Sequence, residues 1–536
     1  MMKEDKSIDK RSDLLESWKN ANSIPALILT LTVFVALPLA FRDLYFDILA
    51  IKYWIYCGTV ISMAIVLLII ALTFIRKDGT ENNYGTIKTV LRGFTIKSFK
   101  ITDWAMILFV ASAVISTFQS EYFYESFWGN EGRYSGLFLI LLYTISYFII
   151  TKCLRFKRWY LDAFVAAGIL TCLVGILHYF KLDPIGFKRD LSPEDYKIFV
   201  STIGNINTYT SYVSLVMGAS TLLFCVEKNK LKKLLYAISM SISIFALITG
   251  ISDNAYLAMI ALLCLLPLYL FNGVRGLRDY VIILAILSTE FLLIDYIGQT
   301  IPTHVMEING LFNVISGFSK LPFVVIVLWA LAVFITILEG ILTRSHKLIE
   351  CNAGRWVWVV ILAVAFFAGV YILYDANIAG NLEKYGSLKN YIIFDDDWGT
   401  HRGYIWRIAI EIYGKFPFMH KLFGYGPDTF GIITVHGYYD DMISRYNEKF
   451  DSAHNEYLQY LVTIGIVGVT AYAGFICTSI IHIIRKAKKC PFVMAVPIAV
   501  VCYCAQAFVN ISVPIVAPIM FTLIMVGLSA VQNDSK

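Results

Sequence analysis

Three short motifs between residues 400 and 468 combine the side chains that a group-transfer reaction at a membrane surface needs. They read HRGYIWR at 401–407, FGYGPDTF at 423–430 and HNEYLQYL at 454–461. Arginine guanidiniums bind phosphate oxygens in a planar, bidentate manner, and a neutral histidine can act as a general base. We therefore expect this part of the chain to carry an active site.

His454 is the candidate general base. Asp451 or Ser452 can cap the helix that follows, which would place His454 in its first turn. The positive end of the helix dipole disfavours a protonated imidazole, so His454 is expected to be neutral and able to accept a proton. A lone histidine is often structural, and His401 and His436 are alternative bases.

Arginines supply the candidate ligands of an anionic group. The 401–418 segment predicts a short amphipathic or interfacial helix, on which Arg402 and Trp406 share a face while Arg407 points elsewhere. Either arginine could instead anchor the segment to lipid headgroups. Arg133 is a third candidate, because an arginine on the outer side of a membrane runs against the positive-inside bias.

Four further residues are weaker candidates for substrate contacts: Asn455, Trp406, Asn205 and Tyr209. The last two lie at the start of an expected helix, where capping is the alternative role. The Gly/Pro pattern of 423–430 predicts a turn with a mainly structural role. Three consecutive aspartates at 395–397 could bind a divalent metal, but neighbours in sequence need not converge on one ion, and we predict no metal site.

The composition predicts an all-α, polytopic membrane protein. Of 536 residues, 58% are hydrophobic and 16% are charged, which lies outside the range of soluble globular proteins. Apolar runs of about 18–25 residues can cross a hydrocarbon core of about 30 Å. We expect fourteen membrane helices, at 23–42, 50–75, 101–119, 135–151, 159–180, 206–226, 234–252, 254–272, 280–298, 321–343, 356–374, 454–484, 491–510 and 513–531.

Lysine and arginine clusters in alternate connections predict the orientation in the membrane, with both chain ends in the cytoplasm. The expected parts of the chain are a cytoplasmic tail at 1–22, helices 1–11 at 23–374, one long extracytoplasmic catalytic loop at 375–453 between helices 11 and 12, and helices 12–14 with a short cytoplasmic C-terminus at 454–536. The opening residues are too polar and acidic for a secretory signal.

Charge and cysteine content exclude several other classes of protein. The net charge of +6 mostly reflects the positive-inside bias, so we predict no nucleic-acid partner. All ten cysteines fall in membrane segments or cytoplasmic connections, which predicts no disulfide framework and no zinc site.

The motifs resemble those of the O-antigen ligase and O-antigen polymerase family of membrane glycosyltransferases. The resemblance covers roughly residues 120–475. It rests on RGYIWR at 402–407, FGYGPDTF at 423–430 and HNEYLQYLVTIGIVG at 454–468, with weaker matches of GRYSG at 132–136 and GNINTYTSY at 204–212. The number of expected membrane helices departs from the family pattern, because its ligases commonly have fewer than fourteen.

The resemblance implies transfer of a glycan from a polyprenyl diphosphate carrier, such as undecaprenyl diphosphate, to an acceptor hydroxyl on the outer face of the cytoplasmic membrane. The acceptor would be a glycan, a lipid or the cell wall, in the assembly of surface polysaccharide or glycoconjugate of the cell envelope. On this pattern His454 is the base, and Arg402, with Arg407 and Arg133 as further candidates, binds the diphosphate. The reaction would need no metal or other cofactor and would invert the anomeric centre.

Two alternatives remain open. Within the family, the protein could be a polymerase that extends repeat units rather than a ligase that transfers finished glycan. From another class, it could be a flippase or transporter of lipid-linked oligosaccharide. Transporters tend to show two similar halves with polar or broken helices near mid-membrane, whereas the polar chemistry here gathers in one late loop.

Overall fold

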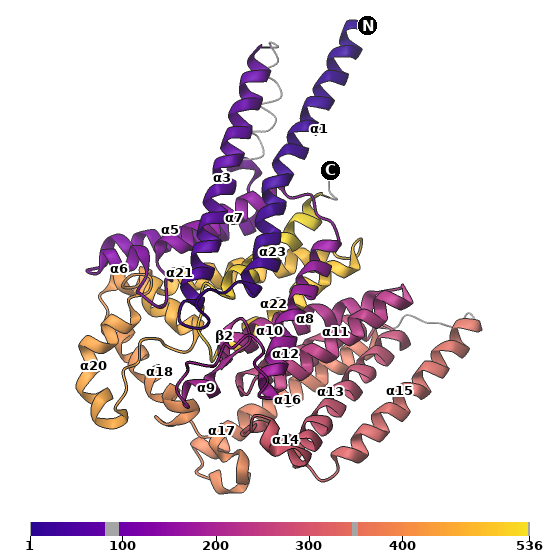
Figure 1. Cartoon of the computed structure of the whole chain (residues 1–536), viewed down its shortest axis with the longest axis vertical. Coiled ribbons are helices and arrows are strands. Elements are labelled where there is room, and N and C mark those ends of the chain that lie inside the picture. The colour runs from indigo at the N-terminus through magenta and orange to yellow at the C-terminus, as the bar shows by residue number, and fades with distance from the viewer. Residues whose placement is uncertain (1, 81–95, 346–351, 534–536) are drawn as a thin grey trace.

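Apolar helices account for most of the chain. The computed structural model describes residues 2–80, 96–345 and 352–533 (Figure 1), and 77% of the protein is helical. Within those ranges the only sheet is a two-stranded antiparallel hairpin, in which β1 (Phe199–Val200) pairs with β2 (Gly204–Asn205). The expected all-α fold is therefore confirmed.

The described residues contain ten helices long and apolar enough to cross a membrane and four shorter apolar ones. Each coincides with one of the fourteen predicted spans, so the polytopic architecture is confirmed. In chain order they are α1 (Met2–Leu31, continued by η1, Thr32–Ala36, and α2, Leu37–Leu39), α3 (Ile48–Thr80), α5 (Ile101–Gln119), α7 (Leu137–Cys153), α8 (Trp159–Tyr179), α10 (Ile206–Val226), α11 (Lys230–Ile248), α12 (Asn254–Leu270), α13 (Val274–Thr300), α15 (Leu321–Arg344), α16 (Ala353–Asn377), α21 (Glu456–Lys486), α22 (Ala495–Ala507, preceded by η5, Pro491–Met494) and α23 (Ala517–Asn533).

The shorter elements gather on one side of the bundle, away from both chain ends (Figure 1). We call this side the loop face; it carries residues 120–136, 180–205, 301–320 and 378–455. Its elements are α6 (Phe123–Trp128), α9 (Asp195–Ile198), η3 (Pro302–His304), α14 (Leu311–Ser316), η4 (Leu382–Leu388), α17 (Lys389–Ile392), α18 (Trp398–Lys415), α19 (Phe418–Phe423) and α20 (Phe430–Tyr446).

Helix α10 lies at the centre of the bundle, and 94% of the residues in its most apolar stretch are buried. It packs against α8, α11, α12 and α22. A Cβ on Gly218 would lie 2.7 Å from the Cα of Ala499 in α22, so only glycine allows this approach. Small residues at helix contacts let backbones come close where lipid supplies no hydrophobic drive.

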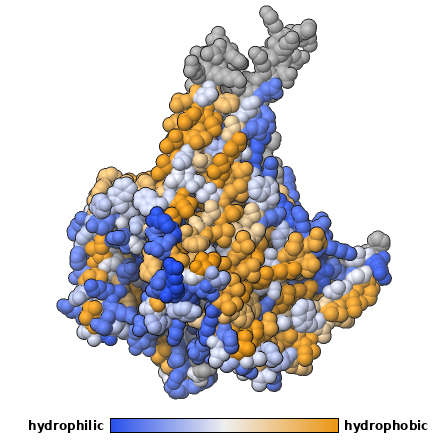
Figure 2. Space-filling model, viewed as in Figure 1, coloured by the Kyte–Doolittle hydropathy of each residue, from blue (hydrophilic) through white to orange (hydrophobic). Residues whose placement is uncertain are grey.

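Hydrophobic side chains cover the middle and right of the molecule over α13 and α15, and the stem formed by α3 (Figure 2). Hydrophilic side chains gather instead over α18 and α20 at the lower left. In α16, none of the residues in the most apolar stretch is buried. Apolar helices exposed in this way are stable in lipid, because a helix satisfies its own backbone hydrogen bonds.

The long loop between α16 and α21 folds around a small hydrophobic core of its own. Its buried members are Tyr404, Ile405, Ile408, Ala409, Ile412, Phe416, Phe430, Met442, Phe450, Ala453 and Val462. The predicted helix at 401–418 is confirmed as α18, which is regular from Arg402, because the three preceding residues have positive φ. The core holds α18 against the start of α21 and so fixes Arg402 relative to His454.

Candidate active site

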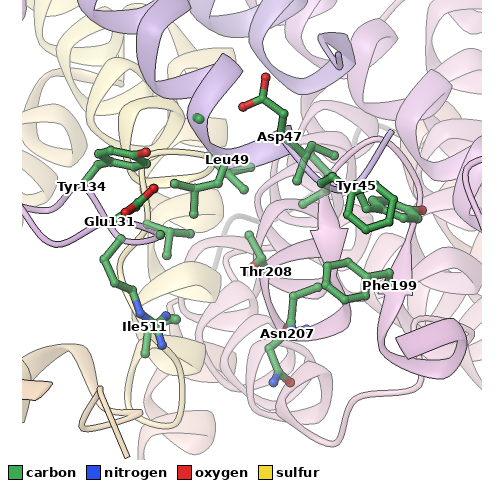
Figure 3. A pocket seen from close by; sticks show the side chains of 18 of the residues that line it. Tyr45, Asp47, Leu49, Glu131, Tyr134, Phe199, Asn207, Thr208 and Ile511 are labelled. Carbon is green, nitrogen blue, oxygen red and sulfur yellow. Dashed lines mark hydrogen bonds between the residues drawn. The ribbon is translucent and has the colours of Figure 1, made fainter. Parts of the chain in front are cut away.

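A cavity of about 460 Å³ on the loop face brings together three of the predicted site residues, Arg133, Asn205 and His454. Its walls come from the start of α3, the turn before α7, the β1–β2 hairpin and the residues between α22 and α23. In Figure 3, Tyr45 and Phe199 face Tyr134 and Glu131 across the cavity. Segments far apart in the sequence thus build one site.

The cavity lining has apolar and polar parts. The apolar part comes from the start of α3 and the residues before α23: Phe46, Ile48, Leu49, Ala50, Ile511, Val513 and Ile515. The polar part includes Asp47, Glu131, Arg133, Asn205, Asn207, Thr208, His454 and Asn510. A concave site with both kinds of surface suits an amphipathic ligand.

The local structure around His454 differs from the prediction. The cap of α21 is Asn455, whose Oδ1 accepts hydrogen bonds from the backbone N–H groups of Tyr457 and Leu458 at 3.1 and 3.0 Å. The hydroxyl of Ser452 instead accepts from the N–H of His454 at 3.3 Å. The expectation that Asp451 or Ser452 caps the helix was wrong, and His454 lies just before the helix, with φ of 45°.

The surroundings of His454 keep its imidazole neutral. Burial, followed by the charges of Arg402 and Arg133, lowers the pKa of His454 to about 4 against a smaller opposing effect of Asp451. No hydrogen bond to the ring is found among the residues that the structure describes. His454 is therefore unprotonated at neutral pH and available to accept a proton.

Arg133 and Arg402 differ in how their charges are balanced. The guanidinium of Arg133 donates to both carboxylate oxygens of Asp451, at 3.2 and 2.6 Å. Burial lowers the pKa of Arg402, and its buried Nε has no hydrogen-bond partner in the described part of the chain. A half-buried guanidinium without a paired carboxylate is an incomplete ion pair, which an anionic ligand would complete.

Arg407 lies outside this cluster. Its guanidinium donates to the two oxygens of Asp396 at 2.8 and 2.9 Å, and Arg445 donates to the same carboxylate at 3.2 Å. Neither Arg402 nor Arg407 lines the cavity, but the charge of Arg402 acts on His454 and that of Arg407 does not. Within the described ranges no group of three His, Cys, Asp or Glu side chains is placed to hold a metal ion.

The weaker candidates have structural contacts. Trp406 donates its indole N–H to the carbonyl of Ala453 at 3.0 Å, which supports the backbone beside His454. Asn205 caps α10 by accepting from the N–H of Asn207 at 2.9 Å, and it also lines the cavity. Tyr209 is 1% exposed inside the bundle and lies outside the cavity lining.

The two alternative histidines also lie outside the cavity lining. His436 shares a hydrogen bond of 2.9 Å with the hydroxyl of Tyr122, and His401 lies 3.5 Å from a carboxylate oxygen of Asp397. Geometry therefore favours His454 among the three.

The Gly/Pro turn at 423–430 has the structural role that its pattern predicts. The N–H groups of Tyr425 and Gly426 donate to the carbonyls of Val462 and Thr463 at 3.1 and 3.0 Å. Gly424 has φ of 77°, and a Cβ there would lie 2.2 Å from the carbonyl carbon of Thr463. The turn thus fastens the loop to α21 just beyond His454.

Asp428, at the end of this turn, is a site residue that sequence reasoning missed. One of its carboxylate oxygens accepts from the N–H groups of Asn130 and Ser135, at 2.7 and 3.2 Å, on either side of Arg133. Burial raises the pKa of Asp428 to about 7, against the opposing effect of these bonds and of Arg133. The available signal was an aspartate in a Gly/Pro turn, where such residues commonly bond backbone amides.

We expect Asp428→Ala to destabilise the protein by about 1–3 kcal/mol, because two part-buried N–H groups lose their acceptor. Asp428→Asn is the matched control, since its Oδ1 can accept the same two bonds and asparagine tolerates the positive φ of this position. Thermal unfolding of the purified variants measures the difference. Equal midpoints for the alanine and asparagine variants would contradict the role of the carboxylate.

Comparison with known families bears on the part of the chain that contains Arg402 and His454. Residues 308–473 match the family model described as O-antigen ligase. The chain carries an O-antigen ligase domain. Comparison with curated proteins found no match. The O-antigen ligase domain contains Arg402, His454 and the turn between them, so the predicted resemblance is confirmed there. The weaker motifs at 132–136 and 204–212 lie outside the match.

The O-antigen ligase domain and the many apolar helices support a multi-pass membrane enzyme of the glycosyltransferase kind, with lipid-linked glycans as substrates in polysaccharide biosynthesis. Arg133 and Asn205, from outside the matched residues, line the same cavity as His454. The site is therefore a product of the whole helix bundle and not of the O-antigen ligase domain alone.

Proposed function

We propose that the protein transfers a glycan from a polyprenyl diphosphate carrier to an acceptor hydroxyl, and that the loop face is extracytoplasmic. The observation that carries this proposal is the convergence of His454, Arg133 and Arg402, whose Nε has no hydrogen-bond partner within the described ranges, beside a cavity with apolar and polar walls. A polyprenyl diphosphate has the same two chemical parts, a diphosphate and a long hydrocarbon.

In the proposed reaction, His454 accepts the proton of the acceptor hydroxyl as its oxygen attacks the anomeric carbon. The bond between that carbon and the diphosphate oxygen breaks, and the electron pair leaves with polyprenyl diphosphate. Attack opposite the leaving group inverts the anomeric centre, and the proton on His454 is later released to water. Fixed guanidiniums of Arg402 and Arg133 stabilise the negative charge that develops on the diphosphate, without a metal ion.

Substrate binding would also change the strength of the base. In the resting site Arg133 is paired with Asp451, so the diphosphate must compete with that carboxylate. Once bound, its negative charge offsets Arg402 and Arg133, the two cations that lower the pKa of His454. A base that is weak in the free enzyme becomes stronger when the donor is in place.

This coupling predicts two different acid limits of activity. The limit of kcat/KM reports the free enzyme and is expected near pH 4, below which His454 is protonated and inactive. The limit of kcat reports the enzyme–substrate complex and is expected at a higher pH, because the bound diphosphate raises the pKa of His454. Initial rates of transfer at low and saturating donor, measured from about pH 3 to pH 8, test this. Coincident limits would contradict it.

Arg407 is not part of the diphosphate site that we propose, because its charge is not among those that act on His454 and its guanidinium is paired with Asp396. Asp396, the middle aspartate of 395–397, is therefore already paired with an arginine.

The test is reconstitution of the full chain in liposomes with a polyprenyl-diphosphate-linked oligosaccharide, candidate acceptors and a chelator. We expect released polyprenyl diphosphate in step with glycan transfer, and a product with inverted anomeric configuration. Supplying either a second lipid-linked repeat unit or a finished lipid acceptor distinguishes a polymerase from a ligase. No release with any acceptor, together with lipid-linked glycan crossing the bilayer, would overturn the proposal in favour of a flippase.

A further inference from the structure

Three aromatic side chains form a cluster beside the candidate site, on α18 and the residues before it. The ring centroids of Phe394, Trp398 and Trp406 lie 5.2–5.8 Å from one another. Phe394 is 56% exposed, and both tryptophans are partly exposed. We call these residues the aromatic cluster; none of them lines the cavity described above.

Both indole N–H groups of the aromatic cluster are already hydrogen-bonded. The indole N–H of Trp406 donates to Ala453, and that of Trp398 donates to the carbonyl of Tyr391 at 3.2 Å. The backbone N–H of Phe394 donates to the side chain of Asn377 at 2.8 Å. With their polar groups already bonded, the rings can offer a ligand only apolar contact and π faces.

The aromatic cluster lies next to the reacting groups. Trp406 bonds to the residue directly before His454. Arg402 is four residues from each tryptophan, and its Nη1 would lie 3.6 Å from a Cβ on Gly399, the neighbour of Trp398. His454 therefore has the cavity on the side of α3 and α10, and the aromatic cluster on the side of α18.

The polar groups around the aromatic cluster favour a sugar over a lipid as its occupant. Asp395 and Asp397, directly before Trp398, are exposed, and carboxylates there can accept hydrogen bonds from hydroxyl groups. The same negative charges disfavour contact with anionic lipid headgroups. A pyranose ring presents a face of C–H groups that packs on an aromatic face, and hydroxyl groups around its edge.

We propose that Phe394, Trp398 and Trp406 bind a pyranose ring of the glycan next to the bond that is made or broken. The inference rests on the proposed function, because it places the sugar beside His454. The ring could belong to the donor glycan or to the acceptor, and the experiment separates these sources.

The first measurement is binding without turnover. The full chain in lipid nanodiscs is dialysed to equilibrium against a labelled oligosaccharide, released by mild acid from the host's own lipid-linked glycan. We expect Trp398→Ala and Phe394→Ala to weaken binding about tenfold, the size of a lost aromatic contact, and Trp398→Phe to restore most of it. Phe418→Ala, which removes an exposed ring of α19 that is 72% exposed, is the matched control and should bind like the wild type.

The second measurement is the steady-state kinetics of the same variants. A raised KM for the acceptor with an unchanged KM for the donor assigns the ring to the acceptor, and the converse assigns it to the donor. Oligosaccharide binding and both KM values unchanged in Trp398→Ala and Phe394→Ala would overturn the inference, and a lower thermal stability in lipid alone would then assign the rings to membrane anchoring. Binding by the wild type without transfer would overturn the proposed function and leave the sugar site in place.

Discussion

Replacing His454 with alanine is expected to lower the rate of glycan transfer by about 10²–10⁴-fold, the usual contribution of a positioned general base. In the proposed reaction the neutral imidazole accepts the proton, and it lies in the cavity beside Arg133 and close to the charge of Arg402. The loss should appear mainly in kcat, because the guanidiniums that we propose to bind the donor remain. The rate of polyprenyl diphosphate release from wild-type and variant protein measures it.

The positive φ of His454 requires a second variant to separate catalysis from folding. Alanine is disfavoured at such a position, whereas asparagine adopts it readily. His454→Asn is therefore expected to keep the wild-type unfolding midpoint while losing transfer to the same extent as alanine. Wild-type turnover by the asparagine variant would remove His454 from catalysis.

The membrane fold could be predicted because hydropathy and helix length are local properties of the sequence. All fourteen predicted spans coincide with helices among the described residues, including the four shorter apolar ones. Helix ends were less accurate: α1 begins at Met2, so the polar residues predicted as a tail continue the first helix. A hydropathy pattern marks where the chain is apolar and gives no signal where a polar helix extends beyond the bilayer.

The candidate site could be predicted only in part, because its geometry depends on contacts between distant segments. Arg133, Asn205 and His454 were singled out separately, and the cavity brings them together. The pattern could not separate Arg402 from Arg407, since their difference lies in whether Asp396 is within reach.

The residues that sequence reasoning missed have their partners far away in the chain. Asp428 binds the backbone on both sides of Arg133. The residues at the start of α3 line the cavity only because that helix packs beside α7. The pattern around Asp428 predicts a turn but not its partners, and nothing in the local pattern at the start of α3 marks it as part of a site.

Arg402→Ala is expected to lower kcat/KM by about 10²–10³-fold, the cost of removing one preorganised donor from a charge that develops in the transition state. Arg402 is half-buried, with its Nε unpartnered. A guanidinium there is already desolvated and positioned, so its interaction with a diphosphate is stronger than that of an exposed cation. Arg402→Lys should recover part of the loss, because it restores the charge but not the planar pair of donors.

Arg407→Ala is the matched comparison, since Arg407 lies on the same helix, α18, as Arg402. It removes an exposed ion pair with Asp396, which typically contributes about 0–1 kcal/mol to stability, and we expect transfer within about threefold of wild type.

The change in the pH profile further distinguishes Arg402→Ala from Arg407→Ala. Loss of Arg402 also removes one of the cations that lower the pKa of His454, so the acid limit of kcat/KM should move to higher pH in Arg402→Ala and stay in place in Arg407→Ala. Equal losses of activity in both variants, with no such shift, would show that neither guanidinium acts on the reacting groups.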